Sequence, residues 1–109
     1  MATSYKVLGQ SAPSATTNTT LYTCPSATET VISSLVVANQ AGTSATYRIA
    51  IRPNGAALSN QHYIVYDATI AANTTTAYTL GVTIDATDVV TVYASSANLS
   101  FNAFGSEIA

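Results

Sequence analysis

Apolar and polar residues alternate with a period of two along most of this chain, and this pattern restricts it to β-structure. Tyr47, Ile49 and Ile51, for example, alternate with positions that hold Arg48 and Arg52. Successive side chains of a strand point to opposite faces, so both arginines should lie on one face and the apolar residues on the other. No segment has the i, i+3, i+4 apolar spacing of an amphipathic helix.

Runs of this kind recur at intervals close to the roughly 8–12 residues expected of an all-β sandwich. The expected strands are residues 5–9, 19–23, 30–39, 46–52, 62–67, 75–80, 89–94 and 98–104. Turn residues separate them, most clearly Asn54 and Gly55, which both accept a positive φ at low cost. We therefore expect one domain over residues 1–109, an antiparallel β-sandwich of about eight strands, jelly-roll-like or Ig-like.

The surface of such a sandwich must be almost neutral, because only 7% of the residues are charged. Soluble domains average about 25%. Small neutral polar groups lose less than ions do on leaving water, so this surface is suited to being covered by copies of the chain or by a larger assembly. With three cations and a net charge of −2, the chain is not expected to bind nucleic acid.

Targeting and membrane segments are not expected either. Residues 1–6 lack the apolar region of a secretory signal, and no stretch approaches the roughly 18 apolar residues of a membrane helix. Cys24 is the only cysteine, so no intramolecular disulfide is possible, which agrees with assembly in a reducing cytoplasm. We expect the mature protein to be the whole chain.

Catalysis would have to use Cys24 or His62, the only thiol and the only imidazole. Cys24 precedes a proline at an expected strand end, where nothing stabilises a thiolate, so we interpret it as a core residue. His62 begins an apolar strand, where a hydrogen-bonded structural histidine is the simpler interpretation. We predict no enzymatic activity and no catalytic residue.

Metal and cofactor sites are also not predicted. Asp85 and Asp88 could give two oxygens to Ca²⁺, but calcium needs about six to eight. An Asx-turn that leads into the next strand explains this pair better. The acidic residues are otherwise scattered, and no spacing among them suggests a glycosidase pair.

The seven tyrosines allow two interpretations. Aromatic rings beside Asn and Thr could form a sugar-binding surface. Each tyrosine also lies in an expected strand, where it would fill the sandwich or a seam between subunits, and we favour this structural interpretation. Three or more exposed rings on one face would favour sugar binding, whereas buried rings would favour a structural role.

Several segments carry a family resemblance over nearly the whole length. They are Ser4-Tyr-Lys-Val-Leu-Gly-Gln10, Leu21-Tyr-Thr-Cys-Pro25, Glu29-Thr-Val-Ile-Ser-Ser34, Val37-Ala-Asn-Gln40, Tyr47-Arg-Ile-Ala-Ile-Arg-Pro53, Asp88-Val-Val-Thr-Val-Tyr-Ala94 and Leu99-Ser-Phe-Asn-Ala-Phe-Gly-Ser-Glu107. The chain resembles small virion structural proteins of tailed bacteriophages, notably phages of cyanobacteria. These segments are packing and turn patterns, and Cys24 stands where a small aliphatic residue such as Val is expected.

The resemblance implies a non-enzymatic virion protein, assembled in the host cytoplasm, that decorates or cements the capsid. We expect a homo-oligomer, most simply a trimer. Its partners would be itself and other virion proteins such as the major capsid or tail proteins, with no nucleic acid, membrane or cofactor. A tail, collar or fibre component is one alternative, and a carbohydrate-binding adhesin module is another from a different class.

Candidate interface residues lie in the first and last strands: Tyr5, Val7, Leu99, Phe101 and Phe104. Leu99 and Phe101 share a face, whereas Phe104 falls on the other if the strand is unbroken, so one face should be core and the other an interface. Residues 1–17 could form a strand and an extended arm that adds to a neighbour's sheet. Alternatively, residues 5–9 are the first strand of their own sandwich.

Overall fold

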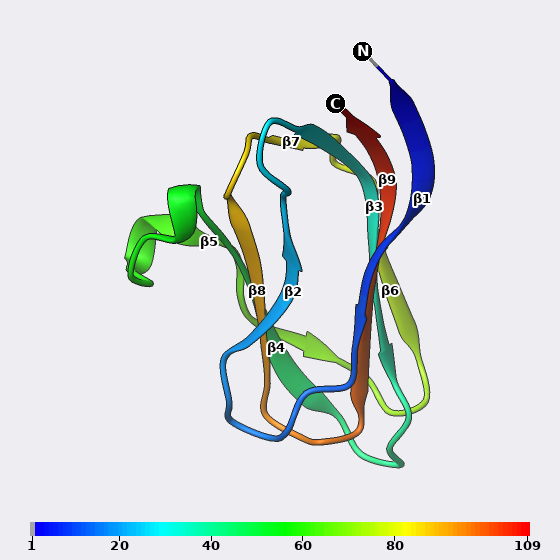
Figure 1. Cartoon of the computed structure of the whole chain (residues 1–109). Helices are drawn as coiled ribbons and strands as arrows, with labels where there is room; N and C mark the ends of the chain where they lie inside the picture. Colours follow the sequence, from blue (N-terminus) through cyan, green and yellow to red (C-terminus); the bar gives the residue numbers. More distant parts are fainter. Residues whose placement is uncertain (1) are drawn as a thin grey trace.

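Two antiparallel sheets pack face to face in the computed structural model, which describes residues 2–109 (Figure 1). The first sheet contains, in spatial order, β1 (Thr3–Ser11), β9 (Leu99–Ile108), β3 (Glu29–Asn39) and β6 (Thr75–Tyr78), with β7 (Val82–Ile84) also paired to β3. The second contains β2 (Thr19–Thr23), β8 (Val89–Ala94), β4 (Ala45–Arg52) and β5 (Tyr63–Ile70). The predicted all-β sandwich is confirmed.

The strand order is that of a jelly roll. The order β1-β9-β3-β6 packs against the order β2-β8-β4-β5, and every ladder is antiparallel. The first two strands therefore lie in different sheets, as in a double Greek key. In an Ig-like sandwich the first two strands share a sheet, so the jelly-roll alternative is the correct one.

Some predicted strand boundaries differ from those of the structure. Residues 2–109 form nine strands, because the predicted strand 75–80 ends at Tyr78 and pairing with β3 resumes in β7. The interruption contains Gly81, whose φ of 64° lies in the left-handed region. His62 is not in a strand but in η2 (Asn60–His62), a short 3₁₀ turn that follows η1 (Pro53–Gly55).

The N-terminal segment belongs to its own sandwich, so of the two alternatives for residues 5–9 the first strand of the domain is the one that the structure shows. Strand β1 pairs with β9 from Thr3 opposite Ile108 to Ser11 opposite Phe101. Residues 12–18 then cross to the other sheet, where the N–H of Thr16 donates to the carbonyl of Ala94 at 2.8 Å. Both chain ends lie at one end of the sandwich beside each other (Figure 1).

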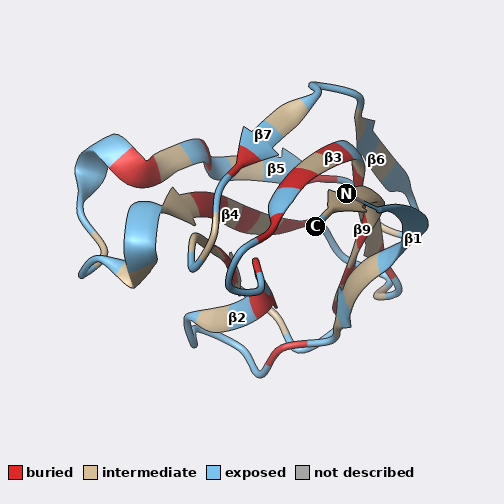
Figure 2. Cartoon of the chain, turned by 45° about the horizontal axis from the view of Figure 1, so that its top comes forward, coloured by how far each residue is buried: buried red, intermediate tan, exposed pale blue. Residues whose placement is uncertain are grey.

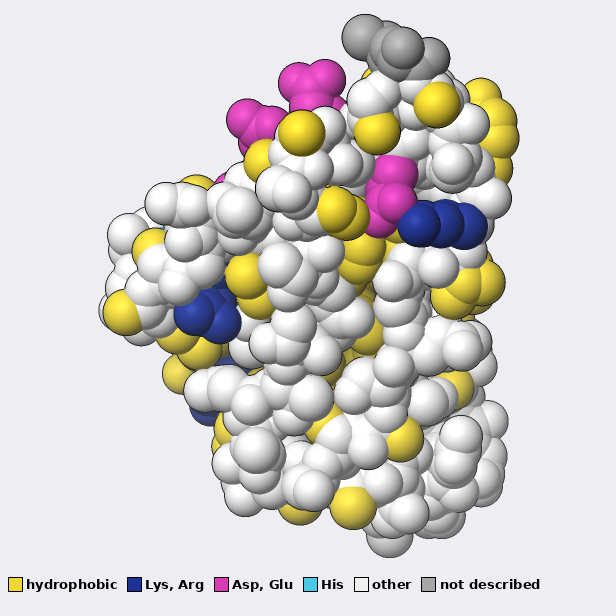
Figure 3. All heavy atoms as spheres, in the orientation of Figure 1, with side chains coloured by type: hydrophobic (Ala, Val, Ile, Leu, Met, Phe, Trp, Pro, Cys, Tyr) yellow, Lys and Arg dark blue, Asp and Glu magenta, His cyan; other side chains and the backbone are white. Residues whose placement is uncertain are grey.

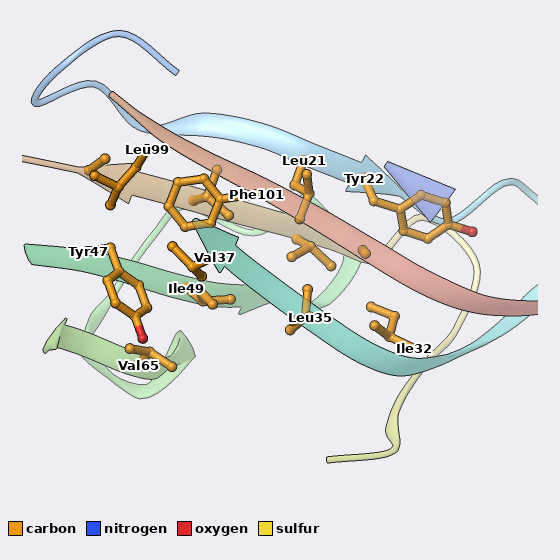
Figure 4. Packing of buried hydrophobic residues seen from close by; sticks show 14 of the residues in the cluster. Leu21, Tyr22, Ile32, Leu35, Val37, Tyr47, Ile49, Val65, Leu99 and Phe101 are labelled. Atoms are coloured by element: carbon orange, nitrogen blue, oxygen red, sulfur yellow. The ribbon is translucent and has the colours of Figure 1, made fainter. Parts of the chain in front are cut away.

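The core lies between the sheets and is built from the inward positions of each strand. Buried residues recur in stripes along β3, β4 and β9, as the period-two pattern predicts (Figure 2). Side chains of both sheets fill the space between them (Figure 4). Tyr47 of β4 packs edge-on against Phe101 of β9, with ring centroids 6.2 Å apart. Such aromatic pairs add roughly 0.5–1.5 kcal/mol to the burial of apolar area.

Candidate binding site: a tyrosine and arginine cluster

The structure separates the two residues that could have formed a catalytic pair. Cys24 is buried, with its Sγ 3.2 Å from Oγ1 of Thr30 and 3.3 Å from the carbonyl of Thr28. Nδ1 of His62 accepts a hydrogen bond from the N–H of Ser59 at 3.1 Å. Cys24 follows β2 and His62 precedes β5, which are the opposite edges of their sheet with β8 and β4 between them. These two side chains therefore do not form a nucleophile–base pair.

The Asp85–Asp88 pair organises a turn. The carboxylate of Asp88 accepts the N–H groups of Asp85 and of Asn54, both at 2.8 Å, and the carboxylate of Asp85 accepts the N–H of Ala86 at 2.8 Å. These oxygens are engaged by the backbone, as expected of a turn. The carboxylate of Asp85 accepts the N–H of the next residue, however, and not the N–H two residues on that defines the predicted Asx-turn. Among residues 2–109, no group of three or more metal-ligating side chains is present.

The five candidate interface residues differ in their burial and fall into three groups. Leu99 and Phe101 are 0% and 1% exposed, so they belong to the core and are withdrawn as interface residues. Phe104 lies on the outer face of β9 and is half-buried. Tyr5 and Val7 are 85% and 50% exposed on β1, which forms one edge of its sheet. Only the N-terminal strand therefore offers large exposed apolar side chains from this set.

An ion pair between Lys6 and Glu107 links β1 to β9. Nζ of Lys6 lies 2.6 Å from Oε1 of Glu107, and the hydroxyl of Tyr22 donates a hydrogen bond to the same carboxylate. The Tyr22 hydroxyl also lies 2.8 Å from Oγ1 of Thr30. The hydrogen bonds from Lys6 and then Tyr22 hold the pKa of Glu107 below its usual 4.5. Burial, followed by the Glu107 carboxylate, raises the pKa of Tyr22.

On the outer face of the other sheet, Arg48 of β4 lies between two tyrosine rings. Its guanidinium carbon is 4.4 Å from the ring centroid of Tyr66 and 4.4 Å from that of Tyr93. The guanidinium also donates to both carboxylate oxygens of Asp67, at 2.6 Å from Nε and 3.3 Å from Nη2. This ion pair raises the pKa of Arg48. We call Arg48, Tyr63, Tyr66, Asp67 and Tyr93 the tyrosine cluster.

Two register shifts in the pairing of β5 with β4 assemble the tyrosine cluster, one at Tyr66 and Asp67 and one at Ile64, which has no partner between Val65 and Tyr63. Tyr47 is paired with Ala68 and Ile49 with Val65, so two residues of β5, Tyr66 and Asp67, oppose the single residue Arg48. Both are exposed, whereas strict alternation would turn one of them inward. Asp67 has a φ of 52°, in the left-handed region that non-glycine residues enter at a cost. Bulges often re-aim side chains in this way beside functional sites.

Next to the cluster is a surface hollow of about 400 Å³, lined by Asn60, Tyr63 and Tyr66. The rings of Tyr63 and Tyr66 meet edge to face, with centroids 4.9 Å apart and planes at 80°. Asn60 comes from the loop that joins β4 to β5. Arg52 anchors this loop, since its Nε donates to the carbonyl of Ala56 at 2.7 Å and its Nη2 to the carbonyl of Gly55 at 2.9 Å.

The sequence predicted only part of this site. Alternation placed Arg48 on the outer face, and the Asn54-Gly55 signal correctly predicted a turn with positive φ at both residues. The same alternation would place Tyr63 and Tyr66 on opposite faces, because they are three residues apart. The only local signal for the bulge is Asp67 itself, since Asp tolerates the left-handed region better than most residues.

Comparison of the chain with protein families, with curated proteins and with solved structures gives no significant match. Within residues 2–109, no helix is long and apolar enough to span a membrane.

Proposed function

We propose that this chain is a non-enzymatic structural protein of a phage virion that decorates or cements the capsid as a homo-oligomer. The observation that carries the proposal is the exposed edge of the first sheet at β1, where Tyr5 and Val7 face solvent. An edge strand presents a row of unpaired backbone N–H and C=O groups to which another chain can add. Affinity then comes from main-chain hydrogen bonds and needs no charge.

The neutral surface supports the same proposal. Charged side chains are few in the view of Figure 3, where uncharged polar and apolar atoms cover most of the face. Lys6, the only charged residue of β1, already pairs with Glu107 of the neighbouring strand. A second copy approaching β1 would therefore meet little unpaired charge. By analogy of fold alone, jelly rolls occur in both viral capsid and lectin domains.

The separation of Cys24 from His62 supports the non-enzymatic part of the proposal. A nucleophile needs a base within hydrogen-bond reach, and these residues stand at opposite edges of one sheet. The role proposed for the chain is therefore contact with copies of itself and with other virion proteins, in the virion and without a cofactor. A tail, collar or fibre position would use the same edge and is the alternative within the particle.

The test is incorporation into particles by an edge variant. The double substitution Tyr5→Lys and Val7→Lys puts charge on exposed positions of β1 and leaves the core untouched. Leu80→Lys is the matched control, because Leu80 is also exposed but lies between β6 and β7 at the other edge of the same sheet. Circular dichroism verifies that each variant is folded.

We expect wild type and the Leu80 control to co-sediment with purified particles, and the edge variant to remain in the supernatant. Gold-labelled antibody against the chain then distinguishes head from tail. A wild-type chain that is absent from purified particles would overturn the proposal. Normal incorporation of the edge variant would show that β1 is not the surface through which the chain joins the particle.

A carbohydrate-binding adhesin module is the second candidate, and one observation favours it. Tyr63, Tyr66 and Tyr93 gather on one face of the second sheet, with Tyr66 exposed and Tyr63 and Tyr93 half-buried. This meets the expectation for a sugar-binding surface in part, since that expectation was three exposed rings. Tyr22 and Tyr47, in contrast, are buried and serve the core.

A further inference from the structure

We propose that the hollow lined by Asn60, Tyr63 and Tyr66 binds a neutral sugar, either free or at the end of a glycan chain. The inference names the ligand class and residues for the second candidate function, and it does not depend on membership of a virion. It rests on four features of the described residues: ring geometry, polar groups, charge and backbone strain.

The two tyrosine rings form a corner. Their planes meet at 80° with centroids 4.9 Å apart, and both line the hollow. One ring can therefore support the apolar C–H face of a pyranose while the other closes its side. Tyrosine suits this role, since its ring is apolar and its hydroxyl remains available for hydrogen bonds. The volume of about 400 Å³ lies at the small end of ligand sites, which matches one or two sugar rings.

Asn60 supplies the polar recognition that a sugar requires. Its side chain is an amide, which offers two donor hydrogens and one acceptor oxygen. Sugar hydroxyls also donate and accept, so an amide can pair with two neighbouring hydroxyls at once. Asn60 is exposed at the start of η2, and the Arg52 hydrogen bonds fix the preceding part of this loop.

The charge of the cluster favours a neutral ligand over an acidic one. Arg48 is the only cation of the cluster, and Asp67 binds it through two hydrogen bonds. Its guanidinium is also covered by the rings of Tyr66 and Tyr93. An acidic group would have to displace Asp67 from this position, whereas a neutral sugar leaves the pair intact.

The same contacts preorganise the site. Stacking on Arg48 limits the motion of Tyr66, so little side-chain entropy is lost when a ligand binds. The positive φ of Asp67 is an energetic cost that the fold accepts at this bulge. Strain of this kind clusters at ligand sites, and here it keeps Tyr66 and Asp67 on the outer face together.

The test is a titration of the ¹⁵N-labelled protein followed by amide chemical shifts. The probes are glucose, galactose and mannose, raised to about 100 mM because a single small sugar binds weakly. Glucuronic acid is the acidic comparison. Tyr66→Ala removes one wall of the corner, and Asn60→Ala removes the amide. Leu80→Ala is the matched control, because Leu80 is an exposed residue between β6 and β7 of the other sheet and lies away from β1.

We expect at least one neutral sugar to shift the amides of residues 60–67 in a saturable manner, more tightly than glucuronic acid does. Tyr66→Ala and Asn60→Ala should each weaken binding about tenfold or more, whereas Leu80→Ala should bind as wild type. The proposal is overturned if none of the three sugars shifts these amides, if both site variants bind as wild type, or if glucuronic acid binds best. Shifts of residues 60–67 that depend on protein concentration alone would indicate a second copy and would also overturn it.

Discussion

At the scale of single residues, Tyr47 shows how a polar atom is accommodated inside the sandwich. Its ring is buried between the sheets, and its hydroxyl shares a hydrogen bond with the hydroxyl of Tyr78. Burial, followed by the hydrogen bond with Tyr78, raises the pKa of Tyr47, so the hydroxyl stays neutral and able to donate. The alternation in β4 predicts that Tyr47 points inward, but it does not predict that a second tyrosine, Tyr78, lies within hydrogen-bond reach of its hydroxyl.

Tyr47→Phe should therefore lower the free energy of unfolding by about 1 kcal/mol, the usual net value of one hydrogen bond. The ring and its packing on Phe101 remain. Urea denaturation measures the change, and Tyr5→Phe at an exposed position is the control, for which no change is expected. A Tyr47→Phe protein as stable as wild type would show that the hydrogen bond between Tyr47 and Tyr78 contributes nothing to stability.

Glu107 gives the stability of the protein a dependence on pH. Its pKa is lowered in the folded state, first by Lys6 and then by Tyr22. A carboxyl with a depressed folded pKa stabilises the fold above its unfolded pKa, and this stabilisation is lost as the pH falls through the folded value. Glu107→Gln should therefore be less stable than wild type at neutral pH.

As the pH falls below the unfolded pKa of Glu107 and through its lowered folded pKa, the difference between Glu107→Gln and wild type should shrink, because the wild-type carboxyl then becomes neutral as well. Thermal denaturation of both proteins over this pH range measures it. A constant difference at every pH would mean that the ion pair with Lys6 does not stabilise the fold.

At the scale of elements, β9 has little room for added side-chain atoms, because it lies between β1 and β3. Gly105 of β9 faces the bulge of β3, and a Cβ added there would lie 2.0 Å from the carbonyl oxygen of Val31 and 3.0 Å from Cα of Ile32. Both atoms belong to the backbone, so only a shift of the strands could relieve the overlap. The close approach, rather than any special φ, requires glycine at this position.

Gly105→Ala should lower the free energy of unfolding by about 3 kcal/mol, the upper range for overpacking in a dense interior. Gly42→Ala is the matched control, since a Cβ there meets nothing within 4 Å, and its effect should stay within about 0.5 kcal/mol. Equal stability of the two variants in urea would contradict the close packing of β3 on β9.

The elements also show where sequence patterns stop being informative. Strands β2 and β8 are found at the predicted residues. Their burial does not alternate strictly, however, because Leu21 and Tyr22 of β2 and residues 90–92 of β8 are neighbours that are all buried. The bulge at Tyr66 and Asp67 and the interruption between β6 and β7 were not predicted. Each of these irregularities is set by the register of pairing with a partner strand, β4 for the bulge and β3 for the interruption. The local sequence does not specify that register.

At the scale of the whole molecule, local patterns predicted two packed sheets but not the strand order. Residues 1–17 illustrate the reason. Their sequence allowed either an arm or a strand, and the choice depends on pairing with β9, about a hundred residues later in the chain. The almost neutral surface, by contrast, follows from composition alone and was predicted directly.

The central claim is that the molecule works by association, with β1 as the edge that joins copies. Sedimentation velocity of the purified chain at micromolar concentration tests it most directly. The account predicts a stable oligomer, most simply a trimer, that Tyr5→Lys combined with Val7→Lys dissociates into folded monomers, whereas Leu80→Lys leaves it intact. A wild-type chain that sediments as a monomer under these conditions would contradict the account.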